Sequence, residues 1–368
     1  MKGKIAYLCL ESTQEGHASY THVHEIISGL KRRGWEVELF SPRYDNKGEP
    51  PSLLTKCCKF LSVQFRLWKK SHCMNVLYVR GHPVALPIVL WCRLYGIPIV
   101  LEVNSPYDDL FLAYPWTVYF KPLFKALMLA PMKTANALIV VTFELKGWVE
   151  KKVGHKPVYV IPNGANTELF HPDANSQYVL SRPYVIFFGA LARWQGIDTV
   201  LKAVKSPEWP QEISLVIVGD GVERPMVEKA SKSNKKVIYL GKIPYNEVPG
   251  VVANGLAGLI PKNNKGGRSE TGLSPLKLYE TLACGVPAVV TDFPGQADLV
   301  RNKNCGIVIA PGDHVALAKA VAYLYHNPEM RKDMGRRGRE VVELEHSWDR
   351  RAEETGKVIE EVIKGKLP

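Results

Sequence analysis

Residues 184–204 read YVIFFGALARWQGIDTVLKAV. The apolar run 184–188 has the length and the aromatic and β-branched character of a buried strand. Glycines bound the loop at 189–196, and apolar residues at helical spacing follow at 197–204. A strand that passes through a glycine-bounded loop into a helix is typical of an α/β domain with a parallel sheet.

The N-terminal half of the chain begins in the same way. The sequence predicts a strand at residues 5–10, a polar loop at 11–19, and then a helix that ends at Gly34. Further strands are predicted at 35–40, 76–80, 99–103, 137–142, 158–161, 214–218, 237–240, 256–260 and 288–291. Two halves that each start with a strand predict an α/β protein with two Rossmann-like domains. We expect their parallel sheets to face each other across a cleft, with ligands beyond the carboxyl ends of the strands.

A boundary between the two halves is visible as a change in composition. Apolar periodicity lapses between residues 163 and 183, where polar residues and prolines collect. We therefore predict an N-terminal domain at 1–165, a linker at 166–182 and a second domain at 183–345. A charged amphipathic helix within 346–368 is expected to pack back toward the N-terminal domain.

Charge and cysteine content limit the class of protein. The net charge of +12 fits a partner that is nucleic acid, an anionic membrane surface or a phosphate-bearing small molecule. No recognisable nucleic-acid-binding module is present, so we expect no nucleic-acid partner. Seven scattered cysteines without a CxxC pair indicate a reducing cytosol and no structural zinc. The apolar stretches are too short for a signal peptide or a membrane span, which favours a cytoplasmic protein.

The stretch at 266–285, GGRSETGLSPLKLYETLACG, carries the clearest chemical signal. Ser274 suits a helix N-cap and Pro275 the first helical position, which puts Lys277 in the first turn. A cation there opposes the helix dipole unless an anion binds, and the amides, the dipole and Lys277 would all favour a phosphate. Glu280 lies one turn on and could accept hydrogen bonds from sugar hydroxyls. The alternative is an ordinary exposed Lys–Glu pair on a surface helix.

Two other loops could approach a ligand. Gly189 and the loop after it bring backbone close to a ligand, and Arg193 could pair with a phosphate. An ordinary strand–helix connection with an exposed arginine explains the same residues. Gly16 and His17 in the first loop are further candidates, although a plain turn is equally consistent. No GxGxxG or Walker loop is present, which disfavours a nicotinamide cofactor or ATP.

Several of these segments together resemble glycosyltransferase family 4, the retaining transferases with the GT-B architecture. VIPNGANTELFHP at 160–172 resembles the family's interdomain segment. The strand and loop at 187–204, LVIVGDGVE at 215–223 and LYETLACGVPAVVTDFPG at 278–295 resemble its nucleotide-sugar domain. The WQG, SPxKLxE and LEVN motifs identify a branch of the family. The resemblance implies that the first domain binds the acceptor and the second binds the nucleotide sugar.

The resemblance also implies roles for individual residues. Lys277, Arg193 and Glu280 are expected to be catalytic, with Lys277 and Arg193 stabilising the leaving diphosphate and Glu280 holding the ribose. Residues 240–244 are expected to contact the base through their backbone. The donor-binding candidates are Gly189, Gln195, Gly272, Leu273, Ser274, Pro275, Leu276, Glu280, Lys242 and Ile243. The acceptor-binding candidates are Gly16, His17, Arg80, Glu102 and Asn104.

The donor implied is a UDP- or GDP-linked sugar, with no metal or other cofactor required. The family's first glutamate and its donor-loop arginine and lysine are replaced here by Gly272, Ala190 and Gln195. These departures leave open a catalytically inactive nucleotide-sugar-binding scaffold partner. A nucleotide-sugar epimerase or a sugar phosphorylase of the same fold is a further alternative.

Two apolar and basic segments bear on the acceptor. LLTKCCKFLSVQFRLWKK at 53–70 combines leucine, phenylalanine and tryptophan with five basic residues, and 110–132 is rich in aromatic residues and leucine. Such segments can lie on an anionic bilayer. They suggest a glycan or lipid-linked acceptor in cell-surface polysaccharide or glycolipid assembly at the inner face of the membrane. The alternative is a normal core helix with a basic outer side.

Overall fold

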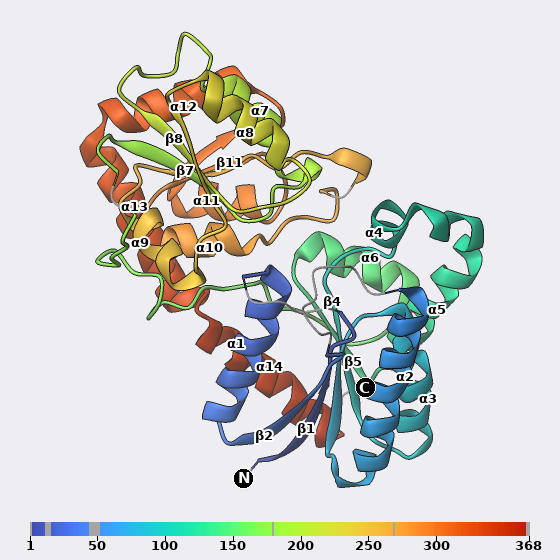
Figure 1. The fold of residues 1–368 in the computed structure, drawn as a ribbon. Helices are drawn as coiled ribbons and strands as arrows, with labels where there is room; N and C mark the ends of the chain where they lie inside the picture. The colour runs from blue at the N-terminus through green and yellow to red at the C-terminus, as the bar shows by residue number, and fades with distance from the viewer. Residues whose placement is uncertain (1, 12–15, 44–51, 179, 268, 366–368) are drawn as a thin grey trace. The chain divides into compact units, whose positions relative to one another are not determined.

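The computed structural model describes residues 2–11, 16–43, 52–178, 180–267 and 269–365. The chain divides into two compact units (Figure 1). The first unit consists of residues 1–162 together with 351–368, and the second consists of residues 163–350.

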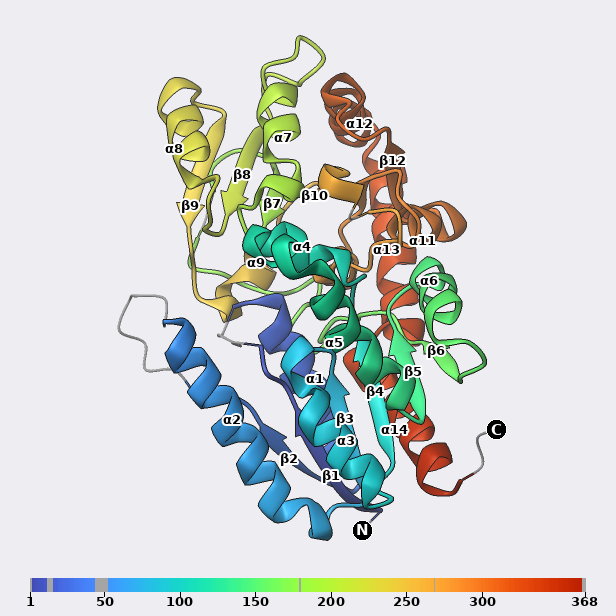
Figure 2. The same ribbon diagram turned by 90° about the vertical axis from the view of Figure 1, so that its right-hand side faces the viewer.

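The first unit contains a six-stranded parallel sheet in the order β2-β1-β3-β4-β5-β6. Its strands are β1 (Gly3–Leu8), β2 (Trp35–Phe40), β3 (Val76–Arg80), β4 (Ile99–Val103), β5 (Ala137–Val140) and β6 (Val158–Val160). Its helices are α1 (Ala18–Arg32), α2 (Leu53–Lys70), η1 (Ser71–Cys73), η2 (Pro83–Ala85), α3 (Leu86–Leu94), α4 (Asp108–Ala113), η3 (Pro115–Phe120), α5 (Lys121–Thr134) and α6 (Phe143–Val153). Helices α2, α3 and α5 lie beside one another along this unit (Figure 2).

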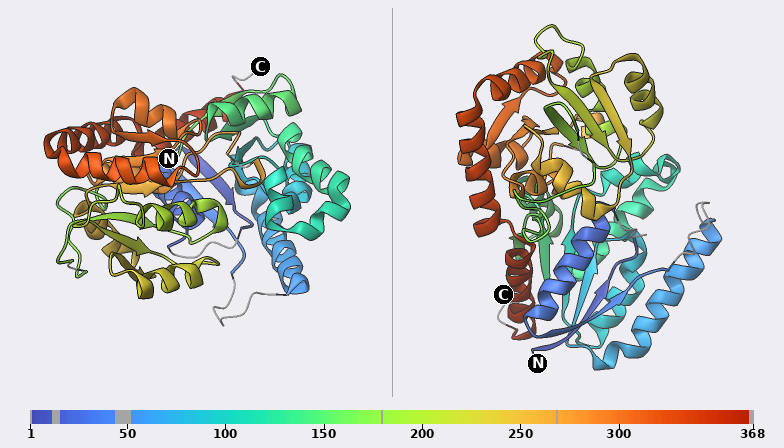
Figure 3. Two further views of the ribbon diagram at one scale, coloured as in Figure 1. Left: turned by 90° about the horizontal axis from the view of Figure 1, so that it is seen from above. Right: turned by 60° about the vertical axis from the view of Figure 1, so that its left-hand side comes forward.

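The second unit repeats this plan with the strand order β12-β11-β10-β7-β8-β9, again all parallel. The strands are β7 (Tyr184–Phe188), β8 (Ser214–Val218), β9 (Val237–Gly241), β10 (Gly258–Ile260), β11 (Ala288–Thr291) and β12 (Gly306–Ile309). The helices are η4 (Arg193–Gln195), α7 (Ile197–Ala203), α8 (Arg224–Ser233), η5 (Tyr245–Glu247), α9 (Val248–Ala253), η6 (Lys265–Gly267), α10 (Leu276–Ala283), α11 (Gln296–Lys303), α12 (His314–His326) and α13 (Pro328–Glu345). Helices flank the sheet of this unit, as the two views of Figure 3 show. Strands β7, β8, β10 and β11 contribute residues to two separate apolar clusters, so this sheet is buried on both faces.

The last helix, α14 (Trp348–Ile363), belongs to the first unit from Arg351 onward. There the Tyr159 hydroxyl donates to the Glu361 carboxylate at 2.7 Å, and the Lys2 ammonium pairs with Glu360 at 2.8 Å. These contacts anchor α14 to strand β6 and to the residue that precedes β1.

The predicted α/β class is confirmed, and the strands predicted at 35–40, 76–80, 99–103, 184–188, 214–218 and 288–291 have the bounds observed. The strands predicted at 5–10, 137–142, 158–161, 237–240 and 256–260 are present with ends that differ by one or two residues. Strand β12 was not predicted. It is a four-residue edge strand that starts at a glycine and is only partly buried, so its apolar signal is short.

Candidate functional site

In each sheet the strand order reverses at one point, and ligands of open α/β sheets bind beyond the carboxyl ends of the strands at that point. In the second unit the reversal lies between β7 and β10. The loop after β7 crosses it through two glycines with positive φ. A Cβ on Gly196 would lie 1.7 Å from the carbonyl oxygen of Pro261, and one on Gly189 would lie 3.5 Å from the Nζ of Lys277. Glycine at 196 therefore lets the backbone approach the end of β10, whereas at 189 the φ of 110° favours glycine and the lysine is in ordinary contact distance.

Lys277 lies in the first turn of α10 and is only 8% exposed. Its Nζ donates to Oε1 of Gln195 at 3.1 Å and lies 4.0 Å from the centre of the Phe187 ring. Burial, and next the charge of Lys262, hold the pKa of Lys277 well below its ordinary value, while Glu280 partly opposes them. Both contacts of the ammonium are with uncharged groups. A phosphate at the start of α10 would meet this cation and the first amides of the helix together.

Glu280 is one turn further along α10 and is 6% exposed. The hydroxyl of Tyr245, in η5, donates to its Oε1 at 2.8 Å. The i, i+3 spacing puts Glu280 on the same side of the helix as Lys277, as the sequence predicts. The observed burial excludes the alternative of an ordinary exposed surface pair.

The segment before α10 differs from the prediction in one respect. Ser274 is not the N-cap: Pro275 occupies that position and the helix begins at Leu276. The Ser274 hydroxyl instead accepts from the backbone N–H of Asn163 at 2.9 Å and lies 2.9 Å from the hydroxyl of Tyr279. The helix therefore starts one residue later, because tertiary contacts occupy the serine oxygen.

Other contacts hold the same segment in place. Gly272 has a φ of 78°, and the next residue, Leu273, forms an isolated parallel bridge with Gly295. The N–H of Leu273 also donates to the carbonyl of Pro294 at 2.8 Å. These contacts fix the direction in which the chain enters α10.

The remaining donor candidates are less closely gathered. Arg193 is exposed, and its carbonyl oxygen accepts from Asn263 at 2.9 Å. Among the described residues, no hydrogen bond or ion pair of its guanidinium is found. Lys242 is exposed just after β9, whereas its neighbour Ile243 is buried. The structure thus brings together Gly189, Gln195, Lys277 and Glu280, and it does not join Arg193 to them.

In the first unit, the reversal of strand order lies between β1 and β3, and a buried ionic network occupies that region. Glu102, at 1% exposure, is its centre. Its carboxylate receives hydrogen bonds from Arg80 at 2.6 Å, Tyr78 at 2.7 Å, His22 at 3.0 Å and Asn104.

These contacts determine the charge state of the network. Burial alone would raise the pKa of Glu102. The neighbouring His22 and Arg80, and hydrogen bonds from His22 and Asn104, outweigh burial and hold that pKa well below its usual range. Arg80 also donates to Glu11 at 3.1 Å. Arg80, Glu102 and Asn104 thus lie together, with Arg80 and Glu102 engaged mainly with each other, and their contact with an acceptor stays a prediction. Gly16 and His17 are exposed at the start of α1, and residues 12–15 of the predicted loop lie outside the described residues.

A pocket adjoins this network at the ends of β3 and β4. Its floor is apolar, with side chains from β4, α5 and α6, and His82 and Asn104 are among its polar lining residues. The Nδ1 atom of His82 accepts from the N–H of Val84 at 3.2 Å. Burial lowers the pKa of His82 to about 4, so the ring is neutral at pH 7 and its proton is on Nε2. The pocket therefore offers a neutral imidazole donor and an amide together with the Glu11 carboxylate and the Ser105 hydroxyl, which suits a hydroxyl-bearing ligand.

Sequence reasoning missed several residues of these sites, including Tyr78, His22 and Glu11 of the ionic network. Phe187 and Lys262 adjoin Lys277, Tyr245 holds Glu280, and His82 lines the pocket of the first unit. His82 follows a predicted strand by two residues, and that position could have marked it. The others had no local signal, because tertiary folding alone brings them to their partners.

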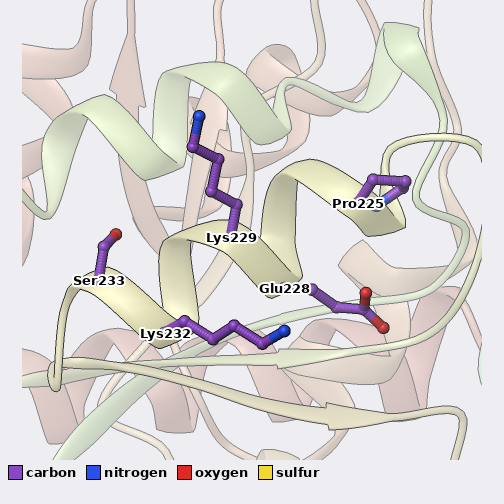
Figure 4. Close-up of a pocket in the computed structure, with 5 residues that line it drawn as sticks. All are labelled: Pro225, Glu228, Lys229, Lys232 and Ser233. Carbon is purple, nitrogen blue, oxygen red and sulfur yellow. The ribbon is translucent and has the colours of Figure 1, made fainter.

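A second pocket lies on α8 and is lined by Pro225, Glu228, Lys229, Lys232 and Ser233 (Figure 4). It is open to solvent and its lysines project from the helix surface. It contains none of the candidate residues.

The second unit thus places a buried lysine and a buried glutamate on one helix of a Rossmann-like sheet. Two models of known sequence families match the chain. One described as Glycosyltransferase Family 4 matches residues 20–169, and one described as Glycosyl transferases group 1 matches residues 174–341. Only the two ends and residues 170–173 lie outside these regions. The chain therefore belongs to the group 1 glycosyltransferases of family 4, and its fold is of the GT-B class.

Individual relatives agree with this family. The alpha-D-kanosaminyltransferase of Streptomyces kanamyceticus is 24% identical over 67% of this chain and 66% of its own length. The alignments with this protein and with two uncharacterized glycosyltransferases of Methanocaldococcus jannaschii cover between 60 and 66% of the length of those relatives. The phosphatidyl-myo-inositol mannosyltransferase of Mycobacterium leprae is 26% identical over 98% of this chain and 97% of its own. The structure of sucrose-phosphate synthase from Thermosynechococcus elongatus superposes with a TM-score of 0.81 at 19% identity, covering 99% of this chain and all of that one.

Proposed function

We propose that the chain is a retaining glycosyltransferase that moves a sugar from a UDP- or GDP-linked donor to a glycan or lipid-linked acceptor. The observation that carries this proposal is the buried Lys277 at the start of α10, one turn from the buried Glu280. In the reaction, the bond from the anomeric carbon to the diphosphate oxygen breaks and its electron pair stays on the leaving diphosphate. A bond to an acceptor hydroxyl oxygen forms, and the proton of that hydroxyl passes to the leaving diphosphate. The second unit supplies the donor site and the first supplies the acceptor site.

Each donor-site residue has a role that follows from its position. Lys277 and the first amides of α10 stabilise the negative charge that grows on the leaving diphosphate. Gln195 stands where the family carries a lysine. Lys277 supplies the missing positive charge, and Gln195 orients it through their hydrogen bond. Glu280 accepts hydrogen bonds from the ribose hydroxyls, and Arg193 is proposed to move onto the diphosphate when the donor binds.

Selective nucleotide binding tests this proposal. We expect thermal unfolding with a panel of nucleoside diphosphates to show stabilisation by one base. A ligand at about 100 times its Kd adds about 2.7 kcal/mol to the free energy of unfolding. The shift should disappear in Glu280→Ala and persist in Glu228→Ala, a change on the surface of α8. A panel without any selective shift would contradict a nucleotide-sugar donor.

The acceptor is proposed to be lipid-linked because the first unit carries a broad apolar and basic surface. Ring contacts join Phe65 to Trp68 on α2, Trp68 to Trp91 on α3, and Trp91 to Tyr95, at 5.3, 5.6 and 4.1 Å between centroids. Helix α5 packs against α3 and extends this surface. We call it the aromatic face. Its exposed large residues are Leu61, Phe65, Trp68, Leu90, Leu94, Tyr95, Leu112, Tyr114, Trp116, Val118, Tyr119, Phe120 and Leu123.

The charges on this surface favour an anionic bilayer as its partner. The sequences of α2, α3, η3 and α5 contain no aspartate or glutamate, whereas lysines and arginines are interspersed with the aromatic residues. The short helix α4, which contributes Leu112, carries Asp108 and Asp109 in its first turn. Lys121 and Lys125 lie over the rings of Phe111 and Tyr107 at 5.5 and 5.3 Å. Apolar burial and attraction to acidic lipids act together in such an arrangement. None of the helices in the described part of the chain has both the length and the apolar character that a bilayer crossing requires.

Vesicle flotation tests the membrane contact. We expect the protein to float with phosphatidylglycerol vesicles and not with phosphatidylcholine vesicles. Because each basic residue near an acidic surface contributes about 1 kcal/mol, Lys121→Glu with Lys125→Glu should weaken binding at least about tenfold. Lys229→Glu with Lys232→Glu on α8 makes the same change in net charge and should leave binding intact. Protein that stays unbound to anionic vesicles at low salt would contradict the contact.

We propose that the enzyme acts at the cytoplasmic face of the cell membrane, in polysaccharide or glycolipid assembly, and the apolar and basic character of the aromatic face supports this proposal. A binding-only scaffold is the second candidate, and Gly272 favours it because the family carries a glutamate at that position. The two are distinguished by turnover: a scaffold would bind the nucleotide sugar and would not consume it with any acceptor.

A further inference from the structure

Tyr245 connects two parts of the second unit that are distant in the sequence. It begins η5, directly after residues 240–244, which are proposed to contact the nucleotide base. Its hydroxyl donates to Oε1 of Glu280 at 2.8 Å, and its ring meets Phe170 edge-on at 5.7 Å between centroids. The ring is therefore packed while the hydroxyl is directed at the carboxylate.

This contact has a consequence for the chemistry of Glu280. A carboxylate has two oxygens and can accept several hydrogen bonds. The tyrosine donor restricts the rotation of the buried side chain, and one oxygen is already committed to it. A hydrogen bond to a carboxylate oxygen is of the strong, charge-assisted kind, so it holds the direction of the Glu280 group firmly.

We propose that Tyr245 is a positioning residue for ribose recognition, and that it couples the base-contacting segment to Glu280. The inference rests on the proposed function, since it needs Glu280 to bind the ribose. Tyr245 itself need not touch the ligand. It sets the direction of the Glu280 carboxylate, so base and ribose are recognised as one rigid unit.

The test compares ribose and dideoxyribose ligands by titration calorimetry. The probes are UDP, GDP and their 2′,3′-dideoxy counterparts. The comparison uses the ribose and dideoxyribose forms of the nucleotide that wild-type protein binds. Wild-type protein should bind the ribose form about tenfold or more tightly than the dideoxy form. Tyr245→Phe should lose most of this ratio by weakening the ribose form, with the dideoxy affinity unchanged within about twofold. A merely structural role would weaken both ligands equally.

Two further variants make the outcome decisive. Tyr184→Phe removes another tyrosine hydroxyl hydrogen bond of the same unit, to the carbonyl of Val251 at 2.7 Å, and should keep the full ratio. Glu280→Gln should abolish the ratio, and adding Tyr245→Phe to it should change nothing further. If Glu280→Gln abolishes the ratio and Tyr245→Phe keeps it, the inference is wrong and the proposed function stands. If Glu280→Gln keeps the ratio, the ribose role itself fails.

Discussion

Lys277→Ala should lower kcat by about 10²- to 10³-fold, the usual loss when one group that stabilises transition-state charge is removed. The lysine is buried and held by Gln195 and the Phe187 ring, so it is oriented before any ligand arrives. Rates are measured with the nucleotide sugar identified by the stability panel. Lys229→Ala, in the exposed pocket of α8, is the matched control and should retain wild-type kcat. A Lys277→Ala enzyme with unchanged kcat would remove the main support for the donor site.

The same lysine predicts a pH dependence of nucleotide binding. Burial and Lys262 depress the pKa of Lys277 in the free protein, and a bound diphosphate would raise that pKa again. The complex therefore holds more protons than the free protein, so affinity should fall as pH rises. Calorimetry in two buffers with different ionisation enthalpies measures the proton uptake. The uptake should vanish in Lys277→Ala, and its persistence there would assign it to another group.

Glu102→Ala should destabilise the protein by about 3–5 kcal/mol, because it leaves Arg80 buried without its main partner. For a unit of this size, that corresponds to a fall in Tm of roughly 10 °C. Glu36→Ala is the control, since it breaks an exposed pair with Lys4 that is worth at most about 1 kcal/mol. Equal effects of the two substitutions would contradict a buried network that holds the strand ends in place.

This network also predicts acid sensitivity. The folded-state pKa of Glu102 lies below the unfolded value, so its contribution to stability is complete above the usual glutamate pKa of 4.5. The contribution is lost as pH falls below that value, because the unfolded chain takes up the proton first. Denaturant unfolding between pH 7 and pH 3 should show a smaller loss of stability in Glu102→Gln than in wild type.

We propose that the acceptor contacts themselves come from Asn104 and His82, which line the adjoining pocket.

The elements that could be read from the sequence are those whose pattern is local. Strands such as β7 (Tyr184–Phe188) and β11 (Ala288–Thr291) are nearly continuous apolar runs, since both faces of a parallel sheet are buried. The i, i+3 spacing of Lys277 and Glu280 fixed their common face once the helix was recognised. The start of that helix was predicted one residue early, because Ser274 bonds with Asn163 and Tyr279. The local sequence pattern does not show that these hydrogen bonds compete with capping of the helix by Ser274.

By itself, then, the sequence determined the α/β class, the two halves and the residue types of the donor segment, all of which depend on neighbours within a few positions. Only the tertiary structure decided which residues surround them. Gln195 meets Lys277 across 82 positions, and Tyr245 meets Glu280 across 35. Likewise, Glu102 receives donors from helix α1 and strand β3, which are separate in the sequence. Such contacts form when parallel strands bring their carboxyl ends to one edge of a sheet. The distance between two residues along the chain does not predict which of them will meet at that edge.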